Sequence, residues 1–109
     1  GSTIGNEGYV KASLRGADFV GSKLDGAWFE SCNFRVAKFN SSTGLDGPSF
    51  RNCSLRSSDF SHVVFTKPCF SNCNMLKINF IGTRLLGASF FRCNLYKAKF
   101  QNSRLEWGN

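Results

Sequence analysis

A large apolar side chain recurs at every fifth position along almost the whole chain. The series slips by one residue near residues 40–44 and then continues, giving 19 central positions that include 11 of the 12 phenylalanines. The residue two places before each central position is mostly small, as at Ala17, Cys32 and Ser58. A repeat of this kind predicts a tandem array of small structural units. The central positions are Leu14, Phe19, Leu24, Phe29, Phe34, Phe39, Leu45, Phe50, Leu55, Phe60, Phe65, Phe70, Met75, Phe80, Leu85, Phe90, Leu95, Phe100 and Leu105.

A five-residue period fits neither regular secondary structure. On an α-helix, which turns by roughly 100° per residue, successive central residues would scatter around the cylinder. On a flat strand five steps is an odd number, so every second central residue would point to the opposite face. The period is consistent only if each pentapeptide turns the chain by a fixed angle and keeps its central and small residues inside. The sequence therefore predicts a solenoid with an apolar interior.

A second period shows how many sides each coil has. Two columns made only of phenylalanine recur every 20 residues, or 21 across the slip, and alternate with two columns that are mostly leucine. A three-sided coil would mix these columns, whereas a four-sided coil keeps them apart. We therefore predict an all-β solenoid of nearly five four-sided coils, with these phenylalanines in its core. The phenylalanine columns are Phe19, Phe39, Phe60, Phe80 and Phe100 and, on another side, Phe29, Phe50, Phe70 and Phe90.

Short motifs in the array resemble the pentapeptide-repeat family, whose loose motif is A-(D/N)-(L/F)-X-X. Ala17-Asp18-Phe19 and Cys93-Asn94-Leu95 fit it, as do Cys32-Asn33-Phe34 and, in part, Ser58-Asp59-Phe60. The resemblance covers about residues 10–105, and its strength lies in the unbroken array. It implies a right-handed quadrilateral β-helix.

The repeats also set the expected domain boundaries. Gly1 and Ser2 look like a cloning scar, and residues 1–8 are expected to be a lead-in. The solenoid is expected over 9–105 with a one-residue bulge near 40–44, followed by a tail at 106–109.

Four of the five cysteines share one predicted inward column. A ladder along the solenoid axis cannot surround a metal ion tetrahedrally, and stacked neighbours are spaced too widely for disulfides. We interpret them as small apolar fillers and expect no metal or other cofactor. Cys69 is expected to be the one exposed thiol. The inward column is Cys32, Cys53, Cys73 and Cys93.

No arrangement in the sequence predicts catalysis. His62, the only histidine, falls at an outward corner position. The serines have no nucleophile motif or partner base, and no glycine-rich phosphate loop is present. The outward carboxylates show no spacing typical of paired acid and base. We therefore expect a protein without enzymatic activity. These carboxylates are Asp18, Asp25, Asp46 and Asp59.

The 14 lysines and arginines exceed the 7 acidic residues, giving a formal net charge of +7. All of the cations fall at outward positions, and seven of them define what we call the basic ridge. Such a ridge predicts binding to an acidic protein or another polyanion, such as nucleic acid or anionic lipid. The alternative is that these charges only keep a stacked surface soluble. The ridge places Arg15, Arg35, Arg56, Lys77 and Lys97 along one corner and Lys38 and Lys99 on the adjoining face.

Aromatic side chains suited to stacking on bases are sparse on the outward positions. The outward aromatics are Trp28, Phe91 and Tyr96, which are candidates for a protein-binding patch. A protein partner is therefore the main expectation and nucleic acid or anionic lipid an alternative. The best-known activity of the pentapeptide-repeat family, binding of DNA gyrase by an acidic rod that mimics DNA, does not fit this cationic surface.

A looser resemblance suggests another class of partner. Short segments such as Phe29–Phe34, Phe50–Leu55 and Phe100–Leu105 are similar to the phenylalanine-rich luminal β-helix of the synaptic vesicle glycoprotein that serves as botulinum neurotoxin receptor. This likeness, natural or engineered, implies that a partner would add a strand at an exposed edge of the solenoid.

Assembly and compartment are predicted only in outline. Both solenoid ends are expected to be exposed, so a homodimer through one end is an expectation, in keeping with the family. No apolar run is long enough to cross a membrane, so no membrane insertion is expected. The sequence does not determine the compartment, and it favours the cytoplasm only slightly. Sequons at Asn40 and Asn52 leave a luminal or extracellular location as the alternative.

Overall fold

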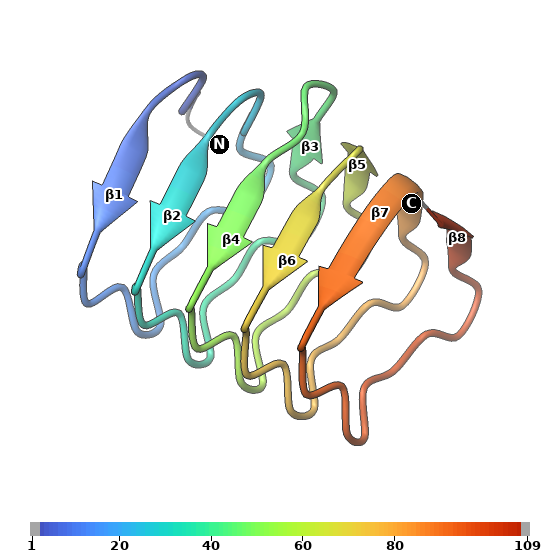
Figure 1. The fold of residues 1–109 in the computed structure, drawn as a ribbon. Coiled ribbons are helices and arrows are strands. Elements are labelled where there is room, and N and C mark those ends of the chain that lie inside the picture. Colours follow the sequence, from blue (N-terminus) through green and yellow to red (C-terminus); the bar gives the residue numbers. More distant parts are fainter. Residues whose placement is uncertain (1–2, 108–109) are drawn as a thin grey trace.

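The computed structural model describes residues 3–107, which wind into a stack of four-sided coils built from short parallel strands (Figure 1). The described residues contain no helix. All pairings between the strands are parallel and join one coil to the next. The strands are β1 (Gly8–Val10), β2 (Trp28–Glu30), β3 (Thr43–Gly44), β4 (Ser49–Arg51), β5 (Val64–Thr66), β6 (Cys69–Ser71), β7 (Arg84–Phe91) and β8 (Arg104–Trp107).

The pairing register reproduces the long period of the sequence. On one side Phe29 pairs with Phe50, and Phe50 with Phe70, which are steps of 21 and 20 residues. This side is the ladder β1-β2-β4-β6-β7, and a second side is the ladder β3-β5-β7 with β8 joined to β7. Isolated parallel bridges such as Ser13 to Asn33 and Asp18 to Lys38 form the other two sides. The predicted four-sided β-solenoid is confirmed.

The corners are made by residues with left-handed backbone. Arg35 and Val36 form one corner, where the Ala37 N–H donates to the Phe34 carbonyl at 2.9 Å. Val36 has a φ of 54°, and a positive φ at this third position of a four-residue turn is the signature of a type II turn. Non-glycine residues adopt this region at a cost of about 1–2 kcal/mol. Stacking of each corner on the next therefore stabilises a conformation that a single pentapeptide would not hold.

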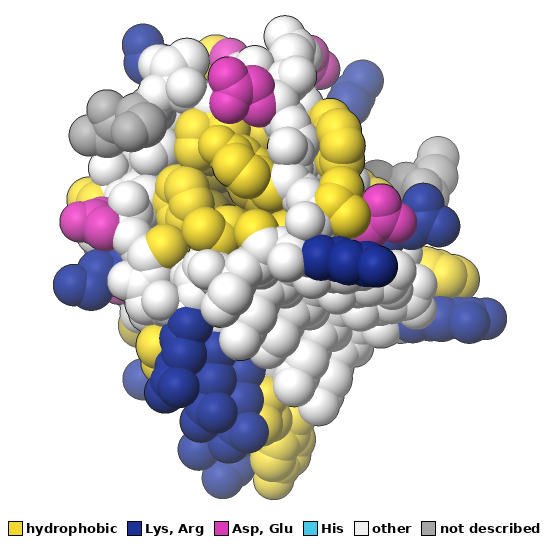
Figure 2. All heavy atoms as spheres, turned by 90° about the vertical axis from the view of Figure 1, so that its left-hand side faces the viewer, with side chains coloured by type: hydrophobic (Ala, Val, Ile, Leu, Met, Phe, Trp, Pro, Cys, Tyr) yellow, Lys and Arg dark blue, Asp and Glu magenta, His cyan; other side chains and the backbone are white. Residues whose placement is uncertain are grey.

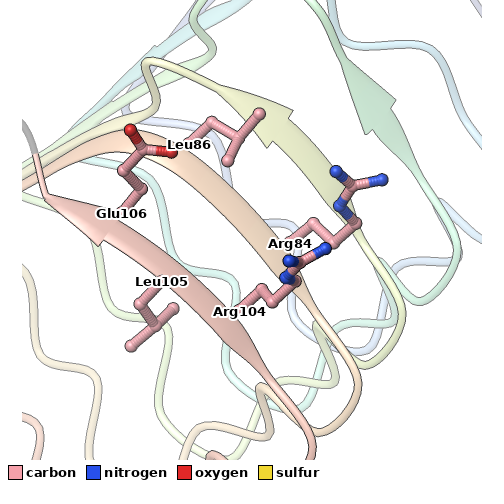
Figure 3. Close-up of a pocket in the computed structure, with 5 residues that line it drawn as sticks. All are labelled: Arg84, Leu86, Arg104, Leu105 and Glu106. Carbon is pink, nitrogen blue, oxygen red and sulfur yellow. The ribbon is translucent and has the colours of Figure 1, made fainter.

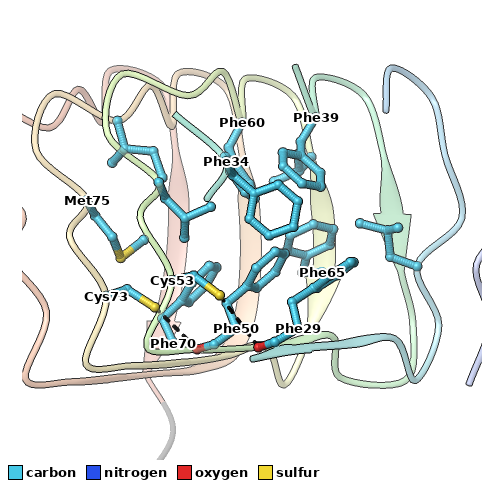
Figure 4. Packing of buried hydrophobic residues seen from close by; sticks show 14 of the residues in the cluster. Phe29, Phe34, Phe39, Phe50, Cys53, Phe60, Phe65, Phe70, Cys73 and Met75 are labelled. Carbon is cyan, nitrogen blue, oxygen red and sulfur yellow. Dashed lines mark hydrogen bonds between the residues drawn. The ribbon is translucent and has the colours of Figure 1, made fainter. Parts of the chain in front are cut away.

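Phenylalanine rings stack in register along the inside of the coils (Figure 4). The Phe50 and Phe70 ring centroids are 5.2 Å apart with planes 5° from parallel, and Phe39 and Phe60 are 4.5 Å apart at 23°. Rings of the two columns meet edge to face, as Phe39 and Phe50 do at 5.8 Å and 86°. Both geometries are favoured by the ring quadrupole. Phe29, Phe39, Phe50, Phe60, Phe70 and Phe80 are buried, whereas Phe19, Phe90 and Phe100, in the end coils, are half-buried.

The extra residue lies just after the predicted position, between Gly44 and Ser49. Gly44 pairs with Phe65, so Gly44 takes the central position that we assigned to Leu45. Leu45 is wrong as a core residue, because 66% of it is exposed. A Cβ on Gly44 would lie 2.8 Å from the Pro48 Cδ atom. The buried proline ring thus occupies the space beside Gly44 that a larger central side chain would need.

The coils also extend beyond the predicted boundaries. Thr3 bridges to Lys23, and Ile4 is a core residue with 6% exposure, so residues 3–8 belong to the first coil rather than to a lead-in. At the other end β8 pairs Glu106 with Leu86, inside the predicted tail. Residues 1–2 and 108–109 lie outside the described part. None of the described residues forms a helix that could span a membrane.

The first coil leaves a cross-section of the core open. Figure 2 looks at this end and shows hydrophobic side chains surrounded by backbone and polar atoms. Tyr9 is 36% exposed, and Leu14 and Phe19 are half-buried. At the opposite end Leu95 and Phe100 are half-buried. Both ends of the described solenoid therefore present apolar side chains next to strand edges.

Candidate functional site

The predicted basic ridge lies on one corner of the solenoid, but its cations occupy two neighbouring columns. Arg15, Arg35 and Arg56 stand at the first corner position, because the Gly16 N–H donates to the Arg35 carbonyl and the Val36 N–H to that of Arg56. Lys77 and Lys97 stand at the second corner position, where the Lys77 N–H donates to the Tyr96 carbonyl at 2.9 Å. The ridge therefore steps sideways by one residue between the third and fourth coils.

The last two coils carry uncharged residues at the corner position that the arginines occupy in the first three coils. Leu76 and Tyr96 take the place of the arginines there. In the end-on view of Figure 2, lysine and arginine side chains gather at one lower corner beside an uncharged ladder. Arg56 is half-buried, and the other four corner cations are exposed.

The adjoining face alternates charges in register. Asp18, Lys38, Asp59, Asn79 and Lys99 form one line of parallel bridges from coil to coil. The carboxylates serve the backbone, since Asp18 Oδ1 and Asp59 Oδ1 each accept an N–H two residues ahead at 2.9 Å. Asn79 Oδ1 does the same. This local turn explains why aspartate and asparagine are preferred at the position before the central residue.

These carboxylates do not form ion pairs with the ridge. Among residues 3–107 no carboxylate lies within ion-pair distance of a lysine or arginine nitrogen. The positive charges of the ridge are therefore screened only by water and dissolved ions, and they remain available to an anionic partner.

A shallow groove of about 500 Å³ opens between the ridge corner and the adjoining face. Its lysines come from the last two coils, so three of the seven predicted ridge residues converge there. The Ser58 hydroxyl in its wall donates to the Leu55 carbonyl at 2.6 Å. What remains to meet a ligand is mainly ammonium groups with one carboxylate, a set that favours anionic groups. The groove is lined by Ser57, Ser58, Asp59, Lys77, Asn79, Lys97 and Lys99.

The three aromatics predicted to point outward do not lie together. Trp28 stands three coil steps away from the last coil, which carries Phe91 and Tyr96. Their exposed fractions are 46%, 54% and 65%, respectively. The Lys97 Nζ atom lies 5.5 Å from the centre of the Tyr96 ring. Tyr96 thus lies beside the basic ridge, and Trp28 lies on a different coil.

The cysteine ladder is turned inward and its thiols are free. Each sulfur donates to backbone carbonyls, as Cys73 does to Phe50 at 3.3 Å (Figure 4). Burial raises the pKa of Cys32, and hydrogen bonds with the neighbouring thiols of Cys53 and Cys93, together with burial, raise that of Cys73. The hydrogen bonds with Cys73 lower the pKa of Cys53 and that of Cys93 to about 7. The side chains of the ladder fill space inside the coils.

The other titratable residues singled out from the sequence stand apart from one another. Cys69, which was expected to be exposed, is half-buried, and it pairs with Ser49 and Ser89 of the neighbouring coils. His62 is exposed, and its ring covers Gly82 on the next coil, where an added Cβ would lie 2.5 Å from Nδ1. Asp25 Oδ1 accepts the Leu45 N–H at 3.0 Å. Within residues 3–107 no three side chains of histidine, cysteine or acid meet as a metal site would require.

Comparison with known proteins places the fold. The model of the family described as pentapeptide repeats matches residues 10–40, 45–80 and 69–106 in eight copies. No curated protein matches the sequence. Among solved structures, the pentapeptide repeat protein Rfr23 from the cyanobacterium Cyanothece 51142 superposes with a TM-score of 0.86 at 10% identity, over 94% of this chain and 82% of that one.

Two further solved structures share the coil. A pentapeptide repeat protein from the Arabidopsis thaliana thylakoid lumen has a TM-score of 0.56 and 26% identity over 95% of this chain and 68% of that one. A trypsin-treated variant of QnrB1, a plasmid-mediated fluoroquinolone resistance protein, has a TM-score of 0.53 and 21% identity over 93% and 64%. The likenesses to Rfr23 and QnrB1 concern the fold alone. The family model covers most of this chain, and solved members of the family share its four-sided coil. This chain therefore belongs to the pentapeptide-repeat family.

Proposed function

We propose that the chain is a non-enzymatic interaction module that binds an acidic protein segment along its basic ridge. The observation that carries this proposal is the set of ridge cations without ion-pair partners among the described residues. The carboxylates of the adjoining face, Asp18 and Asp59, accept hydrogen bonds from turn N–H groups. A run of acidic side chains would meet one cation at each coil.

The spacing of the ridge favours an extended acidic polypeptide as the partner. Successive coils are separated by the distance between paired strands, about 4.8 Å. An extended chain advances by about 3.3 Å per residue, so acidic side chains at consecutive or alternate residues come near successive cations. The one exposed aromatic on this corner, Tyr96, provides no stacking platform of the kind that single-stranded nucleic acids need.

Charge reversal tests the proposal. The variant Arg35→Glu with Arg56→Glu is compared with the control variant Lys11→Glu with Arg51→Glu, which changes the net charge equally on other parts of the surface. Binding to poly-L-glutamate is measured by calorimetry at low and at physiological salt. We expect the ridge variant to bind at least tenfold more weakly than the control, with salt weakening the binding of the native chain. Equal binding by the two variants would overturn the proposal.

Binding to duplex DNA and to heparin, measured in the same way, distinguishes a protein partner from the polyanion alternative. A ridge that serves nucleic acid binds DNA with a steep salt dependence and loses that binding on charge reversal. If poly-L-glutamate binds while DNA does not at the same ionic strength, the protein partner is favoured. The acidic mimicry of DNA is disfavoured as a function by the net charge of +7.

A second candidate function uses a strand edge. β1 and β8 each have a neighbouring strand on one side only among the described residues, so an extended segment of a partner could continue either ladder. The likeness of Phe29–Phe34 to the toxin-receptor β-helix makes the receptor-binding domain of botulinum neurotoxin the probe for this candidate. Absence of binding at micromolar concentrations would remove it, and binding that survives reversal of the ridge would favour it.

A further inference from the structure

Two arginines stand side by side on a face that the ridge does not touch. Arg84 of β7 and Arg104 of β8 are direct partners in the parallel register. Both side chains are exposed, and Figure 3 shows the two guanidinium groups next to one another on the same side of the strands. Like charges directly opposite one another on paired strands are destabilising. This arrangement therefore carries an electrostatic cost.

No nearby acid relieves the pair. Within the described part of the chain neither guanidinium forms an ion pair, although Glu106 lies on the same strand as Arg104. In Figure 3 the Glu106 carboxylate points toward Leu86 and away from the guanidinium groups. Two positive charges with ten N–H donors between them are thus left facing solvent.

A cleft of about 390 Å³ lies at this pair and is lined by residues of β7 and β8. The arginines line one part of it, and Leu86, Leu105 and Glu106 line the rest. The cleft thus joins a cationic part to an apolar wall with a carboxylate at its rim. A cavity with an apolar lining and a few convergent polar groups is the usual form of a small-ligand site.

We propose that this cleft binds a phosphate monoester, with the phosphate held between the two guanidinium groups and the organic group against Leu86. A phosphate monoester carries close to two negative charges at neutral pH and three strong acceptor oxygens, which match two adjacent guanidinium forks. A carboxylate or sulfonate carries one charge and satisfies one fork. Glu106 at the rim disfavours further phosphates on the same ligand, so the site selects a monoester over a polyphosphate.

Titration with phenyl phosphate, followed by ¹⁵N chemical shifts, tests this site. We expect saturable shifts confined to residues 84–86 and 104–106 and at least tenfold weaker binding of benzenesulfonate, which has the same ring and one charge. Arg84→Gln and Arg104→Gln should each weaken phenyl phosphate binding at least tenfold. The control variant Arg51→Gln, on β4 of another side, should leave it unchanged. Equal binding by all three variants would overturn the proposal.

Two further measurements separate loss of the site from loss of the fold. Without ligand, Arg104→Gln should melt at the same temperature as the native chain or higher, because it relieves the repulsion between like charges. Glu106→Gln should tighten binding of inorganic phosphate by removing a negative charge from the rim. Unchanged or weaker phosphate binding by Glu106→Gln would contradict the assigned geometry. A lower melting temperature for Arg104→Gln would contradict the unrelieved charge on which the proposal rests.

Discussion

At the scale of single residues, the left-handed corners decide which substitutions the chain tolerates. Fourteen non-glycine residues and five glycines have a positive φ among the described residues. Val36 is unusual among them, because a β-branched side chain rarely adopts this region. The one corner without such a residue is the one at Leu45–Gly47, which carries the extra residue.

A pair of valines tests the corner geometry. Val36→Gly should raise the free energy of unfolding by about 0.5–1 kcal/mol, because the relief of the left-handed backbone exceeds the added entropy of the unfolded chain. Val20 is the matched control, since it is also exposed and also in a corner but lacks a positive φ. Val20→Gly should lower the free energy of unfolding by about 0.5–1 kcal/mol. Denaturant unfolding measures both, and equal effects of the two changes would contradict the assignment.

At the scale of the elements, the register around the extra residue is the main difference between sequence and structure. Leu45 fitted the five-residue count because it is a large apolar residue at a permitted step, so the period alone could not reject it. The local signal was the run Leu45-Asp46-Gly47-Pro48, whose last three residues are typical of turns. Ser42 then takes the small inward position, and its hydroxyl donates to the Phe39 carbonyl at 2.6 Å.

Two leucines test this register. Leu24→Ala removes a fully buried side chain from the column that Gly44 continues, and it should lower the free energy of unfolding by about 2–5 kcal/mol. Leu45→Ala changes an exposed side chain and should alter it by less than about 0.5 kcal/mol. If Leu45 were the central residue that its spacing suggested, Leu24→Ala and Leu45→Ala would lower the free energy of unfolding by similar amounts.

The columns of phenylalanine and the four sides could be predicted because a solenoid repeats one rule at every step. The surface follows no such rule. The corner of the ridge and its sideways step both follow from the register, because Arg56 comes directly after Leu55 whereas Lys77 comes two places after Met75. The Arg84 and Arg104 pair was missed because neighbouring cations in a column are usually interpreted as solubilising charge.

At the scale of the whole molecule, the open ends favour association. The principal extents are 29 × 25 × 25 Å, so an end presents a large fraction of the surface. In the first coil Tyr9 is exposed and Leu14 and Phe19 are half-buried, and strand edges lie beside them. Pairing of two ends would cover both the apolar atoms and the unpaired backbone groups.

We therefore expect a homodimer at high concentration that forms through one end. Sedimentation equilibrium over a range of protein concentrations measures it. Val10→Lys should weaken a dimer formed through the first coil, because Val10 on β1 is 53% exposed at that end. The matched change Val20→Lys places the same charge on a corner facing solvent. A monomer at the highest concentrations would refute the dimer.

An anionic partner along one corner of the coil is the function that the basic ridge favours. The most direct measurement is a ¹⁵N chemical-shift titration of the native chain with poly-L-glutamate at physiological salt. We expect saturable shifts at residues 35, 56, 77, 97 and 99, with little change in β4 and β6 on the phenylalanine side. Shifts spread evenly over all 14 lysines and arginines would contradict it, because they would mean that the ridge is only part of a soluble cationic surface.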